Sequence, residues 1–294
     1  MAPVPVPDGV DPAVLEDVAR EVAAAAGRLV LDERPADLGV SEKSSRTDVV
    51  TDMDRRSQQL LLDRLAVLRP DDAVLGEEEG GRGGRSGVTW VVDPIDGTTN
   101  YLYAVPQYSV SVAAVVGDPG TPGAWRALAG VVLAPALGET YSAHVGGGAR
   151  LTTAGGTVPL RVTDVRDLAV SLVGTGFGYD AGDRERQARA LVGLLPRVRD
   201  IRRHGSAALD LCAVACGRLD AYYETGLNAW DRAAGELVAL EAGAVLGGLD
   251  DEVADRDLTW VAAPGVADAF AALVRGLTRE HVVVPAVSAG PKGL

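Results

Sequence analysis

Two aspartates follow an apolar run in the first third of the chain. The run Trp-Val-Val at residues 90–92 favours a buried strand, because tryptophan and valine suit a pleated, half-buried surface. The aspartate, proline and glycine that come next are poor strand formers, so we expect the strand to end at Asp93. Carboxylates beside a buried strand need a positive charge nearby, yet residues 89–124 contain no lysine or arginine. Asp93 and Asp96 therefore favour a bound cation, and hard oxygen ligands select magnesium, calcium or manganese.

Three further acidic groups stand at the ends of expected elements. Asp54 begins a helical segment, the glutamates 77–79 follow a short apolar run, and Asp231 begins another helical segment. Each has a simpler interpretation, because Asp54 and Asp231 could cap their helices and the glutamates could form a solvated turn. For the acidic groups to be unrelated, every one of these simpler interpretations would have to be true at once, and Asp93 and Asp96 would need one as well. That combination is much less plausible than any one of them alone. We therefore predict that these groups share one site.

A cluster of this kind supports metal-assisted phosphoryl transfer. Carboxylates from separate elements can hold two or three cations, of which one lowers the pKa of a bound water and another stabilises the departing alkoxide. A threonine hydroxyl held by a second carboxylate can position that water. The Gly-Thr-Thr turn at residues 97–99 offers backbone N–H groups to a phosphate, and its glycine lets the backbone approach closely.

Other catalytic motifs fit less well. The Asp-x-Asp spacing of the haloacid dehalogenase phosphatases is absent, because Asp93 and Asp96 are separated by two residues. Neither a P-loop nor a G-x-S-x-G motif occurs. Residues 174–178 read Gly-Thr-Gly-Phe-Gly, but Tyr179 stands where a dinucleotide fingerprint needs its third glycine. His204 is an isolated histidine beside two arginines, and we expect it to be structural or peripheral.

Hydrophobic periodicity predicts alternating helices and strands, with a largely antiparallel sheet in the first half. Residues 41–51 are expected to form a loop or hairpin, and the glycine-rich residues 80–87 a flexible loop. The expected helices cover residues 11–32, 54–68, 183–194, 206–216, 229–241 and 264–276. The expected strands cover residues 73–75, 89–92, 108–116, 126–133, 139–143, 168–174, 219–224 and 259–262.

No repeat or linker divides the chain, so we expect two α/β layers that share one interface. The pattern predicts a single domain over residues 11–280. Its first half, 11–165, would carry the metal and phosphate groups on the antiparallel sheet, and its second half, 166–280, would form the substrate side. Residues 1–10 are expected to be a disordered arm, and residues 281–294 a loose tail.

Composition limits the class of partner. The 294-residue chain is 47% hydrophobic, which is enough for a real core, and its net charge is −13. This acidity argues against a nucleic-acid backbone or an anionic membrane surface as the main partner. It would also repel an anionic substrate unless bound divalent cations reverse the sign locally.

Cysteine usage and the apolar runs indicate a compartment. Cys212 and Cys216 stand four positions apart in an apolar helical segment, where free cysteine behaves as a small buried hydrophobe. Without a disulfide framework we expect a cytoplasmic protein. The first residues lack the features of a signal peptide, and no uncharged apolar run approaches the length that spans a bilayer.

Four segments resemble, in order, motifs of the inositol monophosphatase family. Residues 93–100, Asp-Pro-Ile-Asp-Gly-Thr-Thr-Asn, match its first signature, and residues 230–235 match its second, W-D-x-A-A-G. Residues 76–78 match its G-E-E element, and residues 43–54 resemble its K-x-x-x-x-D-[LV]-V-T-x-x-D segment. The resemblance covers about residues 11–280. It implies an α+β fold of five layers, αβαβα, as in the inositol monophosphatase and fructose-1,6-bisphosphatase type, and a magnesium-dependent phosphomonoesterase that is commonly a homodimer.

The same resemblance implies a role for each matched position. Asp54 and Thr98 would orient the nucleophilic water, and with Glu77 they would form the catalytic set. Asp93 would bridge metals, while Asp96 would hold one metal near the leaving group. The full set of metal ligands would be Glu77, Asp93, the backbone carbonyl of Ile95, Asp96 and Asp231.

Substrate contacts are implied as well. The Gly97 and Thr98 amides would hold the phosphate, and Glu224 would contact substrate hydroxyls. Residues 205–207 match the G-[ST]-A-A segment that lines the pocket, whereas residues 174–180 lack the polar substrate contact of animal members and resemble bacterial ones, so no site is expected there. The implied substrate-binding set is Ile95, Asp96, Gly97, Thr98, Gly205, Ser206, Ala207, Glu224 and Asp231.

The expected reaction is hydrolysis of a small polyol monophosphate, myo-inositol 1-phosphate above all, by a metal-activated water. Two or three Mg²⁺ ions are expected; Mn²⁺ or Ca²⁺ can occupy the same sites, and Ca²⁺ and Li⁺ would inhibit. Histidinol phosphate, fructose 1,6-bisphosphate, a nucleotide 3′-phosphate or NADP stay open as alternative substrates. A different class also stays open, namely a catalytically idle metal-binding protein that acts through a partner.

Overall fold

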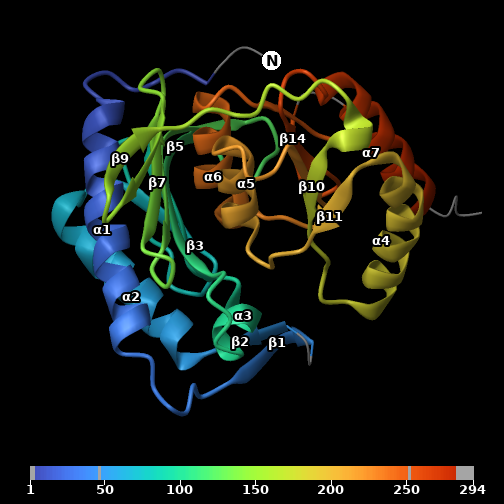
Figure 1. The fold of residues 1–294 in the computed structure, drawn as a ribbon. Coiled ribbons are helices and arrows are strands. Elements are labelled where there is room, and N and C mark those ends of the chain that lie inside the picture. Colours follow the sequence, from blue (N-terminus) through green and yellow to red (C-terminus); the bar gives the residue numbers. More distant parts are fainter. Residues whose placement is uncertain (1–3, 46–47, 251–252, 283–294) are drawn as a thin grey trace, which may run out of the picture.

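The computed structural model describes residues 4–45, 48–250 and 253–282. Figure 1 shows five layers in the order helix pair, sheet, helix pair, sheet, helix pair. This arrangement confirms the αβαβα fold expected from the sequence. The three pairs are α1 (Pro12–Asp32) with α2 (Asp52–Leu68), α5 (Ala207–Ala215) with α6 (Ala229–Glu241), and α4 (Ala181–Leu194) with α7 (Ala267–His281).

The larger sheet has seven strands and lies between the first two helix pairs. Its neighbours are antiparallel except for the first two strands, which run parallel. Sequence order is also spatial order, as in a meander, so the expected antiparallel sheet is present. The strands are β3 (Ala73–Gly76), β4 (Val88–Asp96), β5 (Ser109–Gly117), β6 (Trp125–Ala134), β7 (Glu139–His144), β8 (Ala149–Thr153) and β9 (Gly156–Pro159).

The smaller sheet has five strands in the order β11-β10-β12-β14-β13. Its first three strands pair in parallel and the other two pairings are antiparallel. A separate hairpin precedes α2, and a short helix follows β4. The bounds are β10 (Leu172–Thr175), β11 (Asp200–Arg202), β12 (Ala221–Glu224), β13 (Val245–Gly247), β14 (Thr259–Ala262), the hairpin β1 (Ser41–Ser45) and β2 (Asp48–Val50), and the short helix α3 (Thr98–Leu102).

Strand β4 does not end at Asp93, which corrects the sequence-based expectation. It continues to Asp96 through a bulge, because Asp93 pairs with Ser111 but Asp96 pairs with Ser109. One extra residue therefore stands on β4 between these two pairs, and Pro94 lies in that stretch. Proline lacks a backbone N–H and is tolerated where the ladder is interrupted. The bulge keeps both aspartates on a rigid strand instead of a loop.

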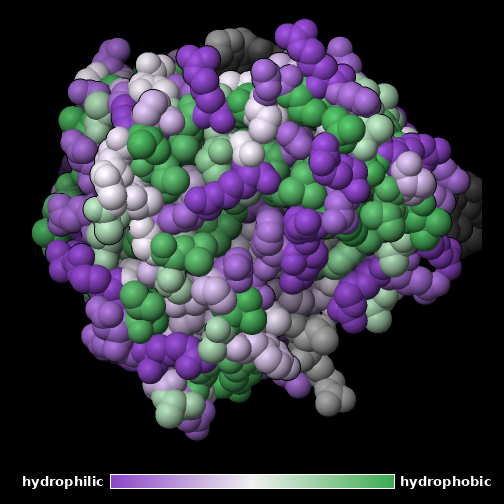
Figure 2. All heavy atoms as spheres, viewed as in Figure 1, coloured by the Kyte–Doolittle hydropathy of each residue, from purple (hydrophilic) through white to green (hydrophobic). Residues whose placement is uncertain are grey.

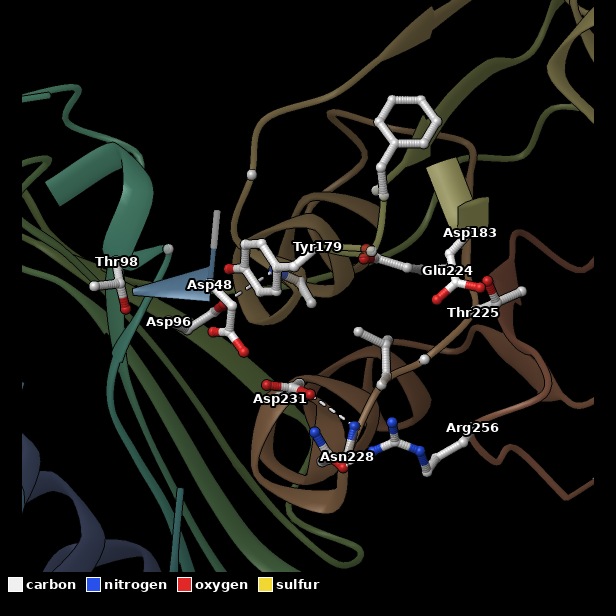
Figure 3. Close-up of a pocket in the computed structure, with 18 of the residues that line it drawn as sticks. Asp48, Asp96, Thr98, Tyr179, Asp183, Glu224, Thr225, Asn228, Asp231 and Arg256 are labelled. Carbon is white, nitrogen blue, oxygen red and sulfur yellow. Dashed lines mark hydrogen bonds between the residues drawn. The ribbon is translucent and has the colours of Figure 1, made fainter. Parts of the chain in front are cut away.

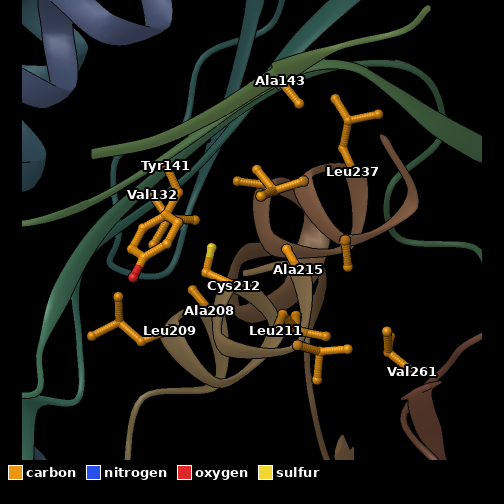
Figure 4. Packing of buried hydrophobic residues seen from close by; sticks show 14 of the residues in the cluster. Val132, Tyr141, Ala143, Ala208, Leu209, Leu211, Cys212, Ala215, Leu237 and Val261 are labelled. Atoms are coloured by element: carbon orange, nitrogen blue, oxygen red, sulfur yellow. The ribbon is translucent and has the colours of Figure 1, made fainter. Parts of the chain in front are cut away.

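The central helix pair packs on the sheets through small side chains. In Figure 4 Val132 and Tyr141 of the large sheet face Ala208 and Cys212 of α5. Cys212 is fully buried, as expected, and Cys216 caps the end of the helix. Small residues let helix and sheet approach closely, so the ends of α5 and α6 are fixed against both sheets. Two further clusters fill the outer layers.

The chain termini differ in part from expectation. Val4, Val6 and Val10 of the expected arm are partly buried against the cluster beneath α1, so this part of the arm contacts the core. Apolar burial of this kind offsets the entropy of ordering the segment. Residues 1–3, and the expected tail from residue 283 on, lie outside the described residues.

Several element boundaries also differ from expectation. Residues 168–170, assigned to a strand from the sequence, form a 3₁₀ turn, and the strand begins at Leu172. Strands β8, β9, β11 and β13 were not expected. Each has five residues or fewer, which is too short for a clear period-two pattern.

The surface carries hydrophilic side chains over most of the face in Figure 2, with apolar ones scattered among them. Among the residues that the structure describes, no helix is both long and apolar enough to cross a membrane.

Candidate active site

The sequence-predicted residues converge on one cavity of about 740 Å³ between the two sheets. Its walls come from the C-terminal end of β4, the start of α3, the N-termini of α5 and α6, the end of β12 and the loop between β10 and α4. Every predicted site residue lines this cavity except Asp54 and Ser206, which lie directly behind Thr98 and Asp96. Figure 3 shows Thr98 and Asp96 on one wall, Asp231 on another and Glu224 on a third.

Asp93 and Glu77 meet at the bottom of the site. Asp93 is 1% exposed, and one of its oxygens accepts the Ile95 N–H at 3.0 Å across the bulge. Glu77 is close enough to form a carboxyl–carboxyl hydrogen bond with it. Burial, together with the charges of Glu77, Asp96 and Asp231, holds the pKa of Asp93 well above its usual value.

Lys43 of the β1–β2 hairpin supplies a positive charge that the sequence reasoning did not assign. Its Nζ lies 2.7 Å from Glu77 Oε1 and also contacts the Glu78 carboxylate. Burial lowers the pKa of Lys43, but the two glutamates more than offset this and leave it above its usual value. Residue 43 belongs to the quoted family segment, so the signal was present; its role depends on the hairpin lying where Lys43 reaches Glu77 and Glu78.

Asp96 is fixed by the N-terminus of α5. Its carboxylate accepts hydrogen bonds from Ser206 Oγ at 2.6 Å and from the Ala208 N–H at 2.8 Å. These donors lower the pKa of Asp96, but burial is the larger effect and raises it to about 7. Free N–H groups at a helix start are natural partners for a carboxylate. The contact ties the predicted metal wall to residues 205–207 of the substrate wall.

Asp54 and Thr98 form the expected pair. Asp54 is the third residue of α2, where it completes a capping box: the Thr51 N–H donates to Asp54 Oδ2 at 2.7 Å. The Thr98 hydroxyl lies 3.1 Å from both Asp54 Oδ1 and the Ile95 carbonyl oxygen. Burial raises the pKa of Asp54 to about 6. Asp54 thus stabilises its helix and also faces Thr98, so its place in the capping box is compatible with the predicted functional role.

Gly97 is needed for the turn that presents Thr98. Its φ is +95°, and a Cβ atom there would lie 3.0 Å from the Gly205 carbonyl oxygen. Only glycine adopts this conformation and this close approach without strain. Asn100 reinforces the junction, because its side-chain N–H₂ donates to the carbonyls of Gln107 at 2.6 Å and His204 at 2.7 Å. The His204 ring binds Asp210, which agrees with its expected structural role.

Asp231 occupies the third position of α6, also in a capping box. One oxygen accepts the Asn228 N–H at 2.6 Å, and the side chain lines the cavity (Figure 3). Burial, followed by the nearby charge of Asp96, raises the pKa of Asp231 well above its usual value. It is therefore not the N-cap, which is Asn228.

Glu224 ends β12 on the substrate side. The Tyr222 hydroxyl donates to Glu224 Oε2 at 2.5 Å, and the Tyr222 side chain is fully buried. Burial raises the pKa of Glu224 to about 7, while this hydrogen bond lowers it. A Cβ atom on Gly176 would lie 1.9 Å from Glu224 Oε2, so a glycine is required where the loop after β10 passes this carboxylate. Sequence reasoning missed both partners.

The donor set fits a hard divalent cation. Four carboxylates with raised pKa values line one cavity, and Glu77 and Asp93 are in direct contact, an arrangement that a cation between them would relieve. In the described part of the chain, however, no three His, Cys, Asp or Glu side chains are grouped so that they could hold a metal ion. Instead, Glu77 forms an ion pair with Lys43. Asp96 accepts a hydrogen bond from the backbone of α5, and Asp231 accepts one from the Asn228 N–H. The ligand assignment therefore stays a prediction.

Comparison with known proteins places the chain. The model of the inositol monophosphatase family matches residues 11–280. An inositol-1-monophosphatase named SuhB from Mycobacterium tuberculosis is 46% identical over 281 residues, covering 90% of this chain and 94% of the relative. A Nus factor SuhB from Pasteurella multocida is 38% identical over 234 residues, covering 78% of this chain and 83% of the relative.

The fold agrees with this relationship. The solved structure of Mycobacterium tuberculosis SuhB superposes with a TM-score of 0.76 at 44% identity, covering 91% of this chain and 98% of that one. A match across nearly the whole chain, and the convergence of the four motifs on one cavity, have a single explanation. The chain belongs to the inositol monophosphatase family.

Proposed function

We propose that this protein is a magnesium-dependent phosphomonoesterase that hydrolyses a cyclic polyol monophosphate, with myo-inositol 1-phosphate as substrate. The observation that carries the proposal is the buried Asp54–Thr98 pair at 3.1 Å beside a cavity that four acidic side chains line. Family membership supports phosphatase chemistry. The match to the inositol-1-monophosphatase of Mycobacterium tuberculosis also covers 94% of that relative's length.

The predicted metal ligands are Glu77, Asp93, the Ile95 carbonyl, Asp96 and Asp231. Magnesium bound there would supply Lewis acidity for the attacking water and for the leaving oxygen. The whole chain has a net charge of −13, so local positive charge is also needed for a phosphate to enter.

The chain's own groups orient the water and carry its proton. When the Thr98 hydroxyl donates to Asp54 Oδ1, its oxygen can accept a hydrogen bond from water. Proton movement from the water to Thr98, and from Thr98 to Asp54, would then proceed along one short path. The pKa of Asp54, raised by burial to about 6, suits a general base that works near neutral pH.

The opposite wall would hold the polyol. Gly97 and Thr98 would offer their amides to the phosphate, and Glu224 would accept hydrogen bonds from ring hydroxyls. Gly205, Ser206 and Ala207 complete this wall, with Ser206 acting through its 2.6 Å bond to Asp96. A carboxylate at this position would reject substrates without hydroxyls, because it would lose its hydrating water and gain no hydrogen bond in return.

The proposal also includes the remaining expectations from the sequence. Two or three Mg²⁺ ions would act together, Mn²⁺ or Ca²⁺ could replace them, and Ca²⁺ and Li⁺ would inhibit. The protein would work in the cytoplasm as a homodimer, a state that sedimentation or light scattering measures directly.

Phosphate release from a panel of esters tests the proposal. The panel holds inositol 1-phosphate, histidinol phosphate, fructose 1,6-bisphosphate, a nucleotide 3′-phosphate and NADP, each with magnesium and with EDTA. We expect the highest kcat/KM for inositol 1-phosphate, loss of turnover in EDTA and recovery on adding magnesium. Turnover that survives chelation would rule out the mechanism, and preference for another ester would replace the substrate.

A second candidate is a catalytically idle protein that binds metal and acts through a partner. Some relatives are named Nus factors and not phosphatases, which favours keeping it. Absence of turnover on every ester, together with magnesium binding in calorimetry, would support this candidate over the first.

A further inference from the structure

The loop between β10 and α4 brings an aromatic side chain to the cavity at a place where no site was expected from the sequence. Tyr179 lines the cavity and is 43% exposed, whereas tyrosine side chains are more often buried to a greater extent. Figure 3 shows its ring between Asp48 and Asp96 on one side and Glu224 on the other, with Asp231 across the cavity. The side chain therefore extends from the substrate wall toward the predicted metal wall.

The loop that carries Tyr179 is held firmly. Gln187 of α4 is 7% exposed; its Oε1 accepts the Gly178 N–H at 3.0 Å and its Nε2 donates to Thr225 Oγ1 at 2.8 Å. Arg184 donates to the Tyr179 carbonyl at 2.6 Å. These contacts fix the loop both to α4 and to the residue next to Glu224.

Glu224 and the loop form one unit for a second reason. Gly176 passes so close to the Glu224 carboxylate that no side chain fits between them. The backbone that carries Tyr179 is consequently fixed relative to the Glu224 carboxylate, and the proposed substrate space lies between the two side chains. Burial, and the charges of Glu77 and Asp96 beyond it, raise the pKa of the Tyr179 hydroxyl, so the phenol stays neutral at working pH.

We propose that Tyr179 is a specificity-determining residue: its ring covers the C–H face of a cyclic polyol while Glu224 accepts that polyol's hydroxyls. A cyclitol presents an apolar face and a rim of hydroxyls, and the two residues match these two features. An acyclic ester such as glycerol 2-phosphate has no ring face to cover. Tyr179 therefore selects the ring, whereas the acidic wall handles the phosphate that all such esters share. This inference rests on the proposed function.

Steady-state kinetics at saturating magnesium test it with inositol 1-phosphate and glycerol 2-phosphate. Tyr179→Ala is expected to raise KM for inositol 1-phosphate about tenfold, the usual worth of an aromatic contact with its burial. The value of kcat should stay within about twofold, and KM for glycerol 2-phosphate should change less than about twofold. Tyr179→Phe keeps the ring and should restore the wild-type KM; Tyr179→Leu is a second truncation that keeps apolar bulk.

Tyr103→Ala is the matched control, because Tyr103 is 75% exposed and lies outside the cavity lining. Equal effects of Tyr179→Ala on both esters, or a fall in kcat for Tyr179→Phe, would overturn the inference, since the ring would then not be the selective element. If the wild type releases no phosphate from either ester with magnesium, the proposed function itself fails. The two failures are thus separate results.

Discussion

At the scale of single residues, the proposed chemistry depends on a hydroxyl held by a buried carboxylate. Thr98 Oγ has two acceptors at equal distance, Asp54 Oδ1 and the Ile95 carbonyl, so its proton can point away from an incoming water. Without this hydroxyl, Asp54 would lose a hydrogen-bond donor and the water would lose its acceptor.

Thr98→Val, which keeps the shape and removes the hydroxyl, should lower kcat about 100-fold with little change in KM. The reason is that the water loses the group that positions it, while the backbone N–H groups proposed to bind the phosphate are unchanged. Thr98→Ser should recover most of the rate. Steady-state kinetics at saturating magnesium measure both; an active Thr98→Val enzyme would show that Thr98 does not orient the nucleophile.

Glu224 predicts a pH dependence of substrate affinity. Its ionised carboxylate accepts hydrogen bonds from hydroxyls more strongly than the neutral acid does, and burial raises its pKa to about 7, so KM should fall as pH rises through 7. Tyr222→Phe removes a hydrogen bond that lowers this pKa, and should move the fall in KM to higher pH. At pH 6.5 the variant's KM should be severalfold above wild type, and at pH 9 the two should converge.

Glu224→Gln is the control for this profile, because an amide does not titrate. Its KM should be raised but flat between pH 6 and 9. If Glu224→Gln keeps the wild-type slope, another group causes the dependence and the assignment of Glu224 fails.

At the scale of elements, helix α2 organises two parts of the site. Asp54 lies in its first turn, and Gln58 one turn later is 1% exposed. Gln58 Nε2 donates to the carbonyls of Glu78 at 2.5 Å and Glu79 at 2.9 Å, and its Oε1 accepts the Glu78 N–H at 2.9 Å. The helix thereby fixes the segment that carries Glu77.

Gln58→Ala should destabilise the protein by about 2–3 kcal/mol, because three backbone groups lose their partner. It should also weaken magnesium binding measured by calorimetry, since Glu77 is no longer held. Gln59→Ala is the neighbouring control, with an exposed side chain that donates a hydrogen bond to Asp63. Equal urea midpoints and equal magnesium affinities for the two variants would contradict this role for Gln58.

The elements also show how far a sequence can be interpreted. The helices of Asp54 and Asp231 were predictable because capping residues and 3.6-residue periodicity are local signals. The continuation of β4 past Pro94 was not, because a bulge depends on the partner strand β5. Likewise Lys43 and Gln58 act through chain segments about twenty to thirty-four positions away, and no local pattern encodes such contacts.

At the scale of the whole molecule, the fold gathers carboxylates that repel one another. Burial raises the pKa of Asp96 to about 7 and that of Asp54 to about 6, from 3.8. These groups are more basic in the folded state, so their contribution to stability is full below pH 4 and is lost as pH rises through 6 to 7. A cation that binds the ionised groups would restore what is lost.

Magnesium should therefore raise the melting temperature more at pH 8 than at pH 5.5. At about 100 times its Kd the gain is roughly 2.7 kcal/mol, or several degrees for a protein of this size. Differential scanning calorimetry in the metal-free protein, with sodium at matched ionic strength as control, measures it. An equal shift at both pH values would mean that the buried carboxylates do not bind the ion.

The five-layer arrangement could be anticipated from four short motifs, because a family signature carries the fold with it. The proposed substrate wall was less predictable, because the positions of Tyr179 in the cavity lining and of Tyr222 beside Glu224 are defined only by the folded chain. A sequence shows which residues can do chemistry more readily than which residues surround them.

Magnesium-dependent phosphate release by Asp93→Asn tests the central claim most directly. The asparagine keeps the size of the side chain and an oxygen for the Ile95 N–H, so melting and circular dichroism should match the wild type. With inositol 1-phosphate and magnesium, we predict that the wild type turns over and that the variant loses more than about 100-fold in kcat/KM. Full activity in a folded Asp93→Asn protein would contradict the account.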